Sequence, residues 1–309
     1  MVFIPGALIR ILLFVGPALM WNKNTQLRNY RNDWKRFQVE MEKLMKSPFK
    51  CLAKNKIRGI FSIGIISMSG LGVLIQTRQW RSDHHRPVAS TFPVLYMMNG
   101  TANIVTYWVV NNTYMISSTK QLIKLVQRSI SKDNYADLRR LIDLWVMLCD
   151  LNEQFINSHS ILFLFLFCST IIIGIIGVFC TVSLLVHGAD KSIGLTYFIS
   201  TIICMLTVMV FCESANSVTK YKIHELRIQL LDENVTNKDK KLIQVISLFL
   251  QTIETKSPEV TFYGCMTVDR SSVSSVLGTA INFLVVLKQF GPNQLIQAVM
   301  YEREVKPHE

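Results

Sequence analysis

The most informative part of this chain is its last apolar run, Ser271-Ser-Val-Ser-Ser-Val-Leu-Gly-Thr-Ala-Ile-Asn-Phe-Leu-Val-Val-Leu-Lys-Gln-Phe290. It is apolar and long enough to cross a bilayer as a helix. A membrane helix that also carries one polar stripe either lines a water-filled path or packs closely against neighbouring helices. Small and polar side chains fall on such a stripe here, at spacings of three and four: Ser271, Ser275, Gly278 or Thr279, Asn282, Val285 or Val286, and Gln289.

Five further apolar runs precede this helix, and together they predict an all-α, polytopic membrane helical bundle. Half of the 309 residues are hydrophobic and the mean hydropathy is positive, which excludes an ordinary soluble domain. The fourth run is the clearest because it carries no charge, whereas asparagines interrupt the third. The predicted spans are residues 3–21, 59–75, 92–117, 161–186, 193–212 and 273–290.

The distribution of lysine and arginine predicts which links face the cytoplasm. Three long links, residues 22–58, 119–160 and 213–272, are rich in both residues and should be cytoplasmic. The shorter links and the tail 291–309 then lie outside the cell. The net charge of +12 is explained by this topology and by anionic lipid, so no nucleic-acid partner is expected.

The cytoplasmic links are predicted to be helical. Residues 137–155 and 239–251 repeat apolar side chains at helical spacing, with charged residues between them. We expect these amphipathic helices to continue the membrane helices into the cytoplasm and to pack into a second core below the bilayer.

No catalytic, cofactor-binding or metal site is predicted. The sequence has no P-loop, GxSxG or HExxH motif and no pair of carboxylates within a span. None of the seven cysteines has the CxxC spacing of a metal site. The pair His84-His85 lies in a predicted outer loop, where a solvated pair of histidines is the simpler interpretation.

The C-terminal sequence resembles the insect gustatory receptor family. Asn282-Phe283-Leu-Val-Val-Leu-Lys-Gln289-Phe290 is similar to the family signature, which is Thr-Tyr, five mostly hydrophobic residues, and Gln-Phe. Residues 262–271 and 146–161 are similar to the family's approach to its last helix and to its long cytoplasmic extension. Asn282 replaces the signature Thr, Phe283 replaces the Tyr, and Lys288 replaces an apolar residue. Lys288 would repel cations if it faced a pore, or would snorkel to the outer surface if it did not.

The resemblance implies a ligand-gated, non-selective cation channel in the plasma membrane of gustatory neurons. Its partners would be a small-molecule tastant, membrane lipid and other gustatory receptor subunits, in a homotetramer or heterotetramer. A bitter-type tastant is favoured over a sugar. The implied pore and gate residues are Ser275, Asn282, Val286, Gln289 and Phe290. The implied ligand pocket, in the outer half of the bundle, offers Tyr96, Asn99, Asn103, Tyr107, Phe179, Thr196, Tyr197 and Ser200.

The same resemblance implies a division of the chain into four parts. These are a ligand-binding bundle at 1–212, cytoplasmic anchor helices at 213–272, a pore-lining helix at 273–290 and an extracellular tail at 291–309. The family is expected to have seven spans, and the six runs correspond to its second to seventh. We therefore expect an incomplete gene model that starts at an internal Met, or a genuinely short variant.

Three alternatives stay open. An insect odorant receptor-type channel subunit has the same architecture, although the ending Gln289-Phe290 argues against it. A non-conducting or truncated chemoreceptor is suggested by Lys288 and by the missing helix. A G-protein-coupled receptor is disfavoured by the number of runs, the long cytoplasmic helices and the expected external C-terminus.

Overall fold

The computed structural model describes residues 23–48, 59, 91–186, 191–220, 224, 226–232, 240–256, 260–262 and 266–289. The predicted spans 3–21 and 59–75, apart from Gly59, lie outside the described residues, as do Phe290 and the predicted tail.

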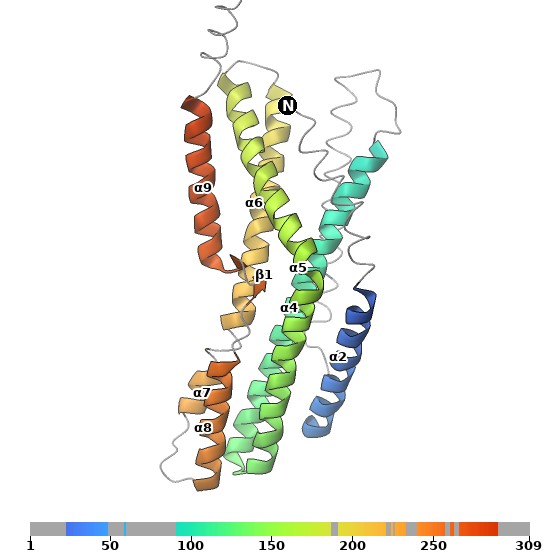
Figure 1. Ribbon diagram of the computed structural model, residues 1–309, viewed down its shortest axis with the longest axis vertical. Coiled ribbons are helices and arrows are strands. Elements are labelled where there is room, and N and C mark those ends of the chain that lie inside the picture. The colour runs from blue at the N-terminus through green and yellow to red at the C-terminus, as the bar shows by residue number, and fades with distance from the viewer. Residues whose placement is uncertain are drawn as a thin grey trace, which may run out of the picture.

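The described part of the chain is helical apart from one short ribbon (Figure 1). This confirms the all-α prediction. Two strands that the sequence did not predict, β1 and β2, pair antiparallel with Thr261 opposite Thr267. The elements are α2 (Asn24–Met45), α4 (Thr91–Ser131), α5 (Tyr135–Val186), α6 (Lys191–Lys220), α7 (Leu226–Asp232), α8 (Lys240–Thr255), β1 (Thr261–Phe262), β2 (Met266–Thr267) and α9 (Arg270–Gln289).

In α5, an amphipathic segment and a membrane run form one continuous helix, as predicted. α5 extends over 52 residues and contains both the amphipathic segment 137–155 and the apolar run 161–186. Among the described residues, two helical stretches are long and apolar enough to cross a membrane, Tyr135–Val182 and Thr201–Thr219.

The turn between α4 and α5 is fixed by backbone hydrogen bonds and by a cap. Asp133 adopts a left-handed conformation with φ of 48°, which ends α4. The N–H of Asn134 donates to the carbonyl of Ser129 at 3.0 Å, and that of Asp133 to Ile130 at 3.2 Å, as in a Schellman motif. The side chain of Asn134 then accepts a hydrogen bond from the N–H of Asp137 at 3.2 Å, which starts α5.

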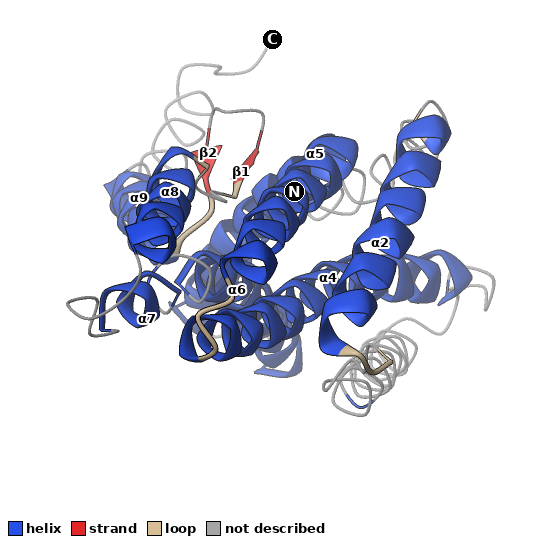
Figure 2. Ribbon diagram, turned by 90° about the horizontal axis from the view of Figure 1, so that it is seen from below, coloured by secondary structure: helices blue, strands red, loops and turns tan. Residues whose placement is uncertain are grey.

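The helices alternate in direction. Figure 1 shows the start of α4, the end of α5, the start of α6 and the end of α9 at the upper end of the molecule, with α7 and α8 at the lower end. Figure 2 shows α2 on the side opposite α8 and α9. The alternation brings the described parts of the links 119–160 and 213–272 to one end of the molecule; that this end is cytoplasmic stays a prediction.

Two hydrophobic clusters hold this arrangement together. The lower cluster joins α2, α4, α5, α7 and α8 around fully buried side chains such as Phe37, Trp145 and Phe249. The upper cluster is aromatic and joins α4, α5, α6 and the ribbon around Trp108 and Phe262. The lower cluster is the second core that the amphipathic patterns predicted.

Candidate pore helix and ligand cavity

Helix α9, the predicted pore helix, begins at an aspartate cap. The carboxylate oxygen Oδ1 of Asp269 accepts a hydrogen bond from the N–H of Ser272 at 2.9 Å and from the hydroxyl of Ser271 at 2.7 Å. These hydrogen bonds lower the pKa of Asp269, so its carboxylate is charged at neutral pH. A negative charge at the first turn also complements the helix dipole.

The first turn of α9 is fastened to two other elements. The guanidinium of Arg270 donates two hydrogen bonds to the carboxylate of Glu213 on α6, from Nε and Nη2, each at 2.8 Å. This fork-shaped contact raises the pKa of Arg270. The hydroxyl of Ser272 donates to the carbonyl of Thr267 on β2 at 2.7 Å. These contacts join the base of α9 to α6 and to the ribbon.

One face of α9 packs against the bundle and the other is open. Val273 and Val276 contact the aromatic cluster, and Ala280 is buried. On the open side, Ser275 and Asn282 are both exposed. A Cβ built on Gly278 would meet nothing within 4 Å, as expected of a residue on this side.

The predicted polar stripe is therefore exposed where it is described. The side chains of Phe283, Val286, Gln289 and Phe290 lie outside the described residues, so their roles in signature and gate stay predictions.

The aromatic cluster that supports α9 centres on Trp108, which the sequence analysis did not single out. The ring of Trp108 stacks on Phe211 with centroids 5.2 Å apart and meets Phe163 and Phe262 edge-on at 4.7 and 5.8 Å. Its indole N–H donates to the carbonyl of Phe211 at 3.3 Å. One side chain thus joins α4, α5, α6 and the ribbon. The only sign of this role in the sequence was a tryptophan among the asparagines of the predicted span 92–117.

Two of the predicted ligand residues, Asn103 and Tyr107, line a cavity of about 860 Å³ between α2, α4 and α5. The ring of Tyr107 lies 5.1 Å from that of His159 and 5.4 Å from that of Phe155. Phe179 is partly buried and does not line this cavity. The side chains of Tyr96, Asn99, Thr196, Tyr197 and Ser200 lie outside the described residues, although their backbones belong to α4 and α6.

The cavity lies deeper than the pocket expected in the outer half of the bundle. Part of its lining comes from α2, including Arg31, and α2 follows the first predicted span on the cytoplasmic side. Tyr107 reaches α2 because it lies past the middle of the run 92–117, toward the cytoplasmic end. That these residues bind a tastant stays a prediction.

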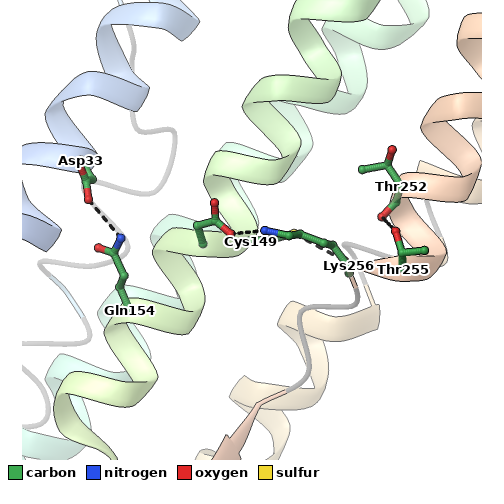
Figure 3. Close-up of polar contacts among 7 residues, drawn as sticks. Asp33, Cys149, Gln154, Thr252, Thr255 and Lys256 are labelled. Atoms are coloured by element: carbon green, nitrogen blue, oxygen red, sulfur yellow. Dashed lines mark hydrogen bonds and ion pairs between the residues drawn. The ribbon is translucent and has the colours of Figure 1, made fainter.

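Polar contacts fasten α5 to its neighbours on both sides (Figure 3). The amide of Gln154 donates to the carboxylate of Asp33 on α2 at 3.1 Å. On the opposite side, Lys256, just after α8, forms an ion pair with Asp150 at 2.5 Å, and this hydrogen bond raises the pKa of Lys256. The thiol of Cys149 donates to the carbonyl of Lys256 at 3.7 Å.

Among the described residues, no group of side chains is arranged like a metal centre. The described cysteines, namely Cys149, Cys168, Cys180, Cys204 and Cys212, are free thiols. In the part of the chain that the structure describes, no three histidine, cysteine or acidic side chains gather as metal ligands would.

Comparison with known proteins assigns the chain to a family. The sequence profile described as 7tm Chemosensory receptor matches residues 3–294. The chain is 25% identical over 288 residues to "Gustatory and odorant receptor 22" of Anopheles gambiae, which covers 90% of this chain and 59% of that receptor. It is 23% identical over 287 residues to "Gustatory and odorant receptor 21a" of Drosophila melanogaster, covering 90% and 61%. The chain therefore spans about three-fifths of the length of these curated relatives.

Solved structures share the fold. The olfactory receptor OR5 from Machilis hrabei in complex with eugenol superimposes with a TM-score of 0.65 at 13% identity, covering 93% of this chain and 82% of that receptor. The same receptor in a second structure gives a TM-score of 0.60 at 12% identity, covering 94% and 79%. Because the family profile matches nearly the whole chain, this chain belongs to the seven-transmembrane chemosensory receptor family of insect gustatory and odorant receptors.

Proposed function

We propose that this chain is a subunit of a ligand-gated, non-selective cation channel whose pore is lined by α9. The observation that carries the proposal is the two-sided character of this helix. The side of α9 that carries Val273 and Ala280 packs on the bundle. Ser275 and Asn282, on the other side, face away from the described part of the chain. An exposed polar stripe on a helix that crosses a bilayer needs water or a partner subunit, because lipid cannot satisfy it.

A tetramer would satisfy both requirements. Four copies of the polar stripe around one axis would enclose a wet path, with Gln289 and Phe290 forming a narrow ring at its outer end. The exposed apolar side chains Leu277, Ile281 and Val285 would contact the neighbouring subunit or lipid. The partners would be copies of this chain or other gustatory receptor subunits. The residues 213–272 would anchor the subunits and 273–290 would line the pore.

Opening would follow from ligand binding in the bundle formed by residues 1–212. A ligand that binds one arrangement of α4 and α5 more tightly shifts the population toward it. The cluster around Trp108 joins these helices to the ribbon, and Arg270 with Glu213 joins α6 to the base of α9. These two connections would carry a change in helix position to the pore.

The ligand would be a small organic molecule, with a bitter-type tastant favoured over a sugar. Tyrosine and asparagine side chains on α4 offer aromatic surface with a few hydrogen-bonding groups, and no cluster of carboxylates suited to the hydroxyls of a sugar is predicted in the pocket. The olfactory receptor OR5 from Machilis hrabei, which shares this fold, forms a complex with eugenol, a small aromatic compound. The site of action would be the plasma membrane of gustatory neurons.

An odorant receptor-type subunit is the second candidate. The names of both curated relatives contain the words gustatory and odorant receptor, and the chain shares its fold with an olfactory receptor. Both observations favour this candidate. A current evoked by volatile compounds and by no bitter compound or sugar would favour this second candidate.

The test is whole-cell current from cells expressing the chain, alone and with a full-length relative, during a screen of bitter compounds, sugars and volatiles. We expect a ligand-evoked cation current that changes in Gln289→Ala and Phe290→Ala. Ser274→Ala is the matched control, since Ser274 is exposed on α9 but lies off the stripe. No current in either setting, with surface delivery confirmed, would contradict the channel and favour a non-conducting chemoreceptor in which Lys288 blocks cations.

A further inference from the structure

The predicted spans put the cavity between α2, α4 and α5 at the level of the inner leaflet. α2 begins directly after the predicted span 3–21. The cavity residues Asn111 and His159 lie near the cytoplasmic ends of the predicted spans 92–117 and 161–186. Lipid headgroups of the cytoplasmic leaflet occupy this depth.

The side of the cavity formed by α2 is strongly basic. Arg28, Arg31 and Lys35 line it, spaced three and four residues apart on one face of the helix. All three are exposed, and none forms an ion pair with another described residue. Among the described residues, no aspartate or glutamate lines the cavity. Three positive charges around one hollow without a carboxylate create a site for an anion.

A buried amide in the cavity wall has an unused donor. Asn111 is 7% exposed, and its Oδ1 accepts a hydrogen bond from the hydroxyl of Tyr30 at 2.6 Å. Its Nδ2, which is buried, has no hydrogen-bond partner. A buried N–H group without an acceptor is destabilising, so a ligand that presents an oxygen here would relieve that cost.

The opposite wall of the cavity is apolar. Ile104 and Val110 on α4 and Leu162 on α5 line it beside the half-exposed ring of Tyr107. Arginine and lysine bind phosphate oxygens, and apolar walls accept the glycerol and the first carbons of an acyl chain. A ligand that is anionic at one end and apolar at the other matches both walls.

We propose that this cavity binds the phosphorylated headgroup of an inner-leaflet lipid. The phosphate oxygens contact Arg28, Arg31 and Lys35 and accept a hydrogen bond from Nδ2 of Asn111. The neighbouring Lys23 takes no part, because its Nζ donates to the carbonyl of Asn157 on α5 at 2.8 Å. The bound lipid then joins α2 to α4 and α5, beside the contact between Asp33 and Gln154.

The test is the dissociation constant of a water-soluble, short-chain phosphatidylinositol bisphosphate for the purified full chain in neutral detergent, measured by thermophoresis. We expect Arg31→Gln and Lys35→Gln each to weaken binding on the order of fivefold. Arg36→Gln is the matched control, because Arg36 is exposed on the same helix but does not line the cavity. Equal weakening by Arg36→Gln would overturn the site and indicate diffuse attraction to the basic helix.

Two further arms identify the ligand. Asn111→Leu keeps the side-chain size and charge but removes the Nδ2 donor together with the acceptor of the Tyr30 hydroxyl. Unchanged lipid affinity in this variant would contradict the proposed geometry, and Tyr30→Phe controls for the lost Tyr30 contact. Inorganic phosphate is added as a competitor, and displacement of the lipid at equal concentrations would assign the site to free phosphate instead. Binding is measured without any current, so the result is independent of whether the chain conducts.

Discussion

The lower and upper halves of the molecule bury their apolar side chains in different ways. In the lower half, the apolar faces of α2, α4, α5, α7 and α8 meet within the chain, and Phe249 and Trp145 are fully buried. In the upper half, α6 leaves large side chains open, including Phe198 at 50% and Leu206 at 54% exposed. The lower half therefore buries a large internal core, although Leu231 and Leu248 on α7 and α8 stay open. In the upper half, α6 requires lipid or neighbouring subunits to cover its open side chains.

The sequence patterns of the two halves differ for the same reason. The cytoplasmic helices are amphipathic because water covers one of their faces. The apolar runs within α5 and α6 have few polar residues because lipid replaces water, whereas α9 has an exposed polar stripe. A membrane helix that is polar on the side facing away from its own bundle indicates where water or a second subunit must lie.

The largest effect is expected from a matched pair of phenylalanine substitutions, one in each half. Phe249→Ala should destabilise the chain by about 3–5 kcal/mol, because it opens a cavity in the lower cluster. Phe198→Ala should cost less than about 1 kcal/mol, because detergent or lipid already covers that side chain. Thermal unfolding of the purified chain in detergent measures both, and equal shifts would contradict the division into two halves.

A second pair compares the buried tryptophans at the centre of each cluster. Trp108→Phe removes an indole N–H that donates to Phe211 and should cost about 1–3 kcal/mol. Trp145→Phe should cost about 1 kcal/mol less, because the indole nitrogen of Trp145 is buried without a partner. The same thermal assay checks the difference, and a larger loss for Trp145→Phe would refute this account of the two clusters.

The helix caps provide a smaller test that also depends on pH. Asp269→Ala and Asn134→Ala each remove a cap and should each cost about 0.5–1 kcal/mol at neutral pH. The pKa of Asp269 is lowered in the folded chain, so its stabilisation is present at neutral pH and is lost as the pH falls through that lowered pKa. The loss of stability in Asp269→Ala should therefore vanish in acid, whereas the loss in Asn134→Ala should remain. Thermal unfolding of both variants at neutral and at acid pH measures the two losses.

The smallest effect is expected at the ion pair between Lys256 and Asp150, since both side chains are 45% exposed. Lys256→Ala should change stability by less than about 0.5 kcal/mol because solvent screens the pair. A double-mutant cycle with Asp150→Asn measures the coupling. A coupling energy above about 2 kcal/mol would show that this contact is a main attachment of α8 to α5.

The sequence predicted the features that depend on local periodicity. It predicted the continuous α5 and a second core formed by the amphipathic helices, because apolar spacing determines which face of a helix is buried. It missed contacts between residues far apart in the chain. Arg270 and Glu213 are separated by 57 residues, and no periodicity connects them.

The cavity was also only half predicted. Asn103 and Tyr107 were named as ligand residues, but their neighbours on α2 were not, since only the packing of α2 against α4 and α5 brings Arg31 to them. The lengths of the intervening links contain no information about this approach. The ribbon before α9 is likewise too short to produce an alternating pattern.

Cysteine accessibility along α9 tests most directly whether its exposed face lines a pore. Ser275→Cys, Asn282→Cys and Ala280→Cys would be expressed with a full-length relative and exposed to a charged thiol reagent during ligand-evoked current, with the unsubstituted chain as control for its native cysteines. We predict that the reagent changes the current at positions 275 and 282 and leaves it unchanged at position 280. Modification at position 280 alone, or equal modification at all three, would contradict the assignment of the polar stripe to the pore.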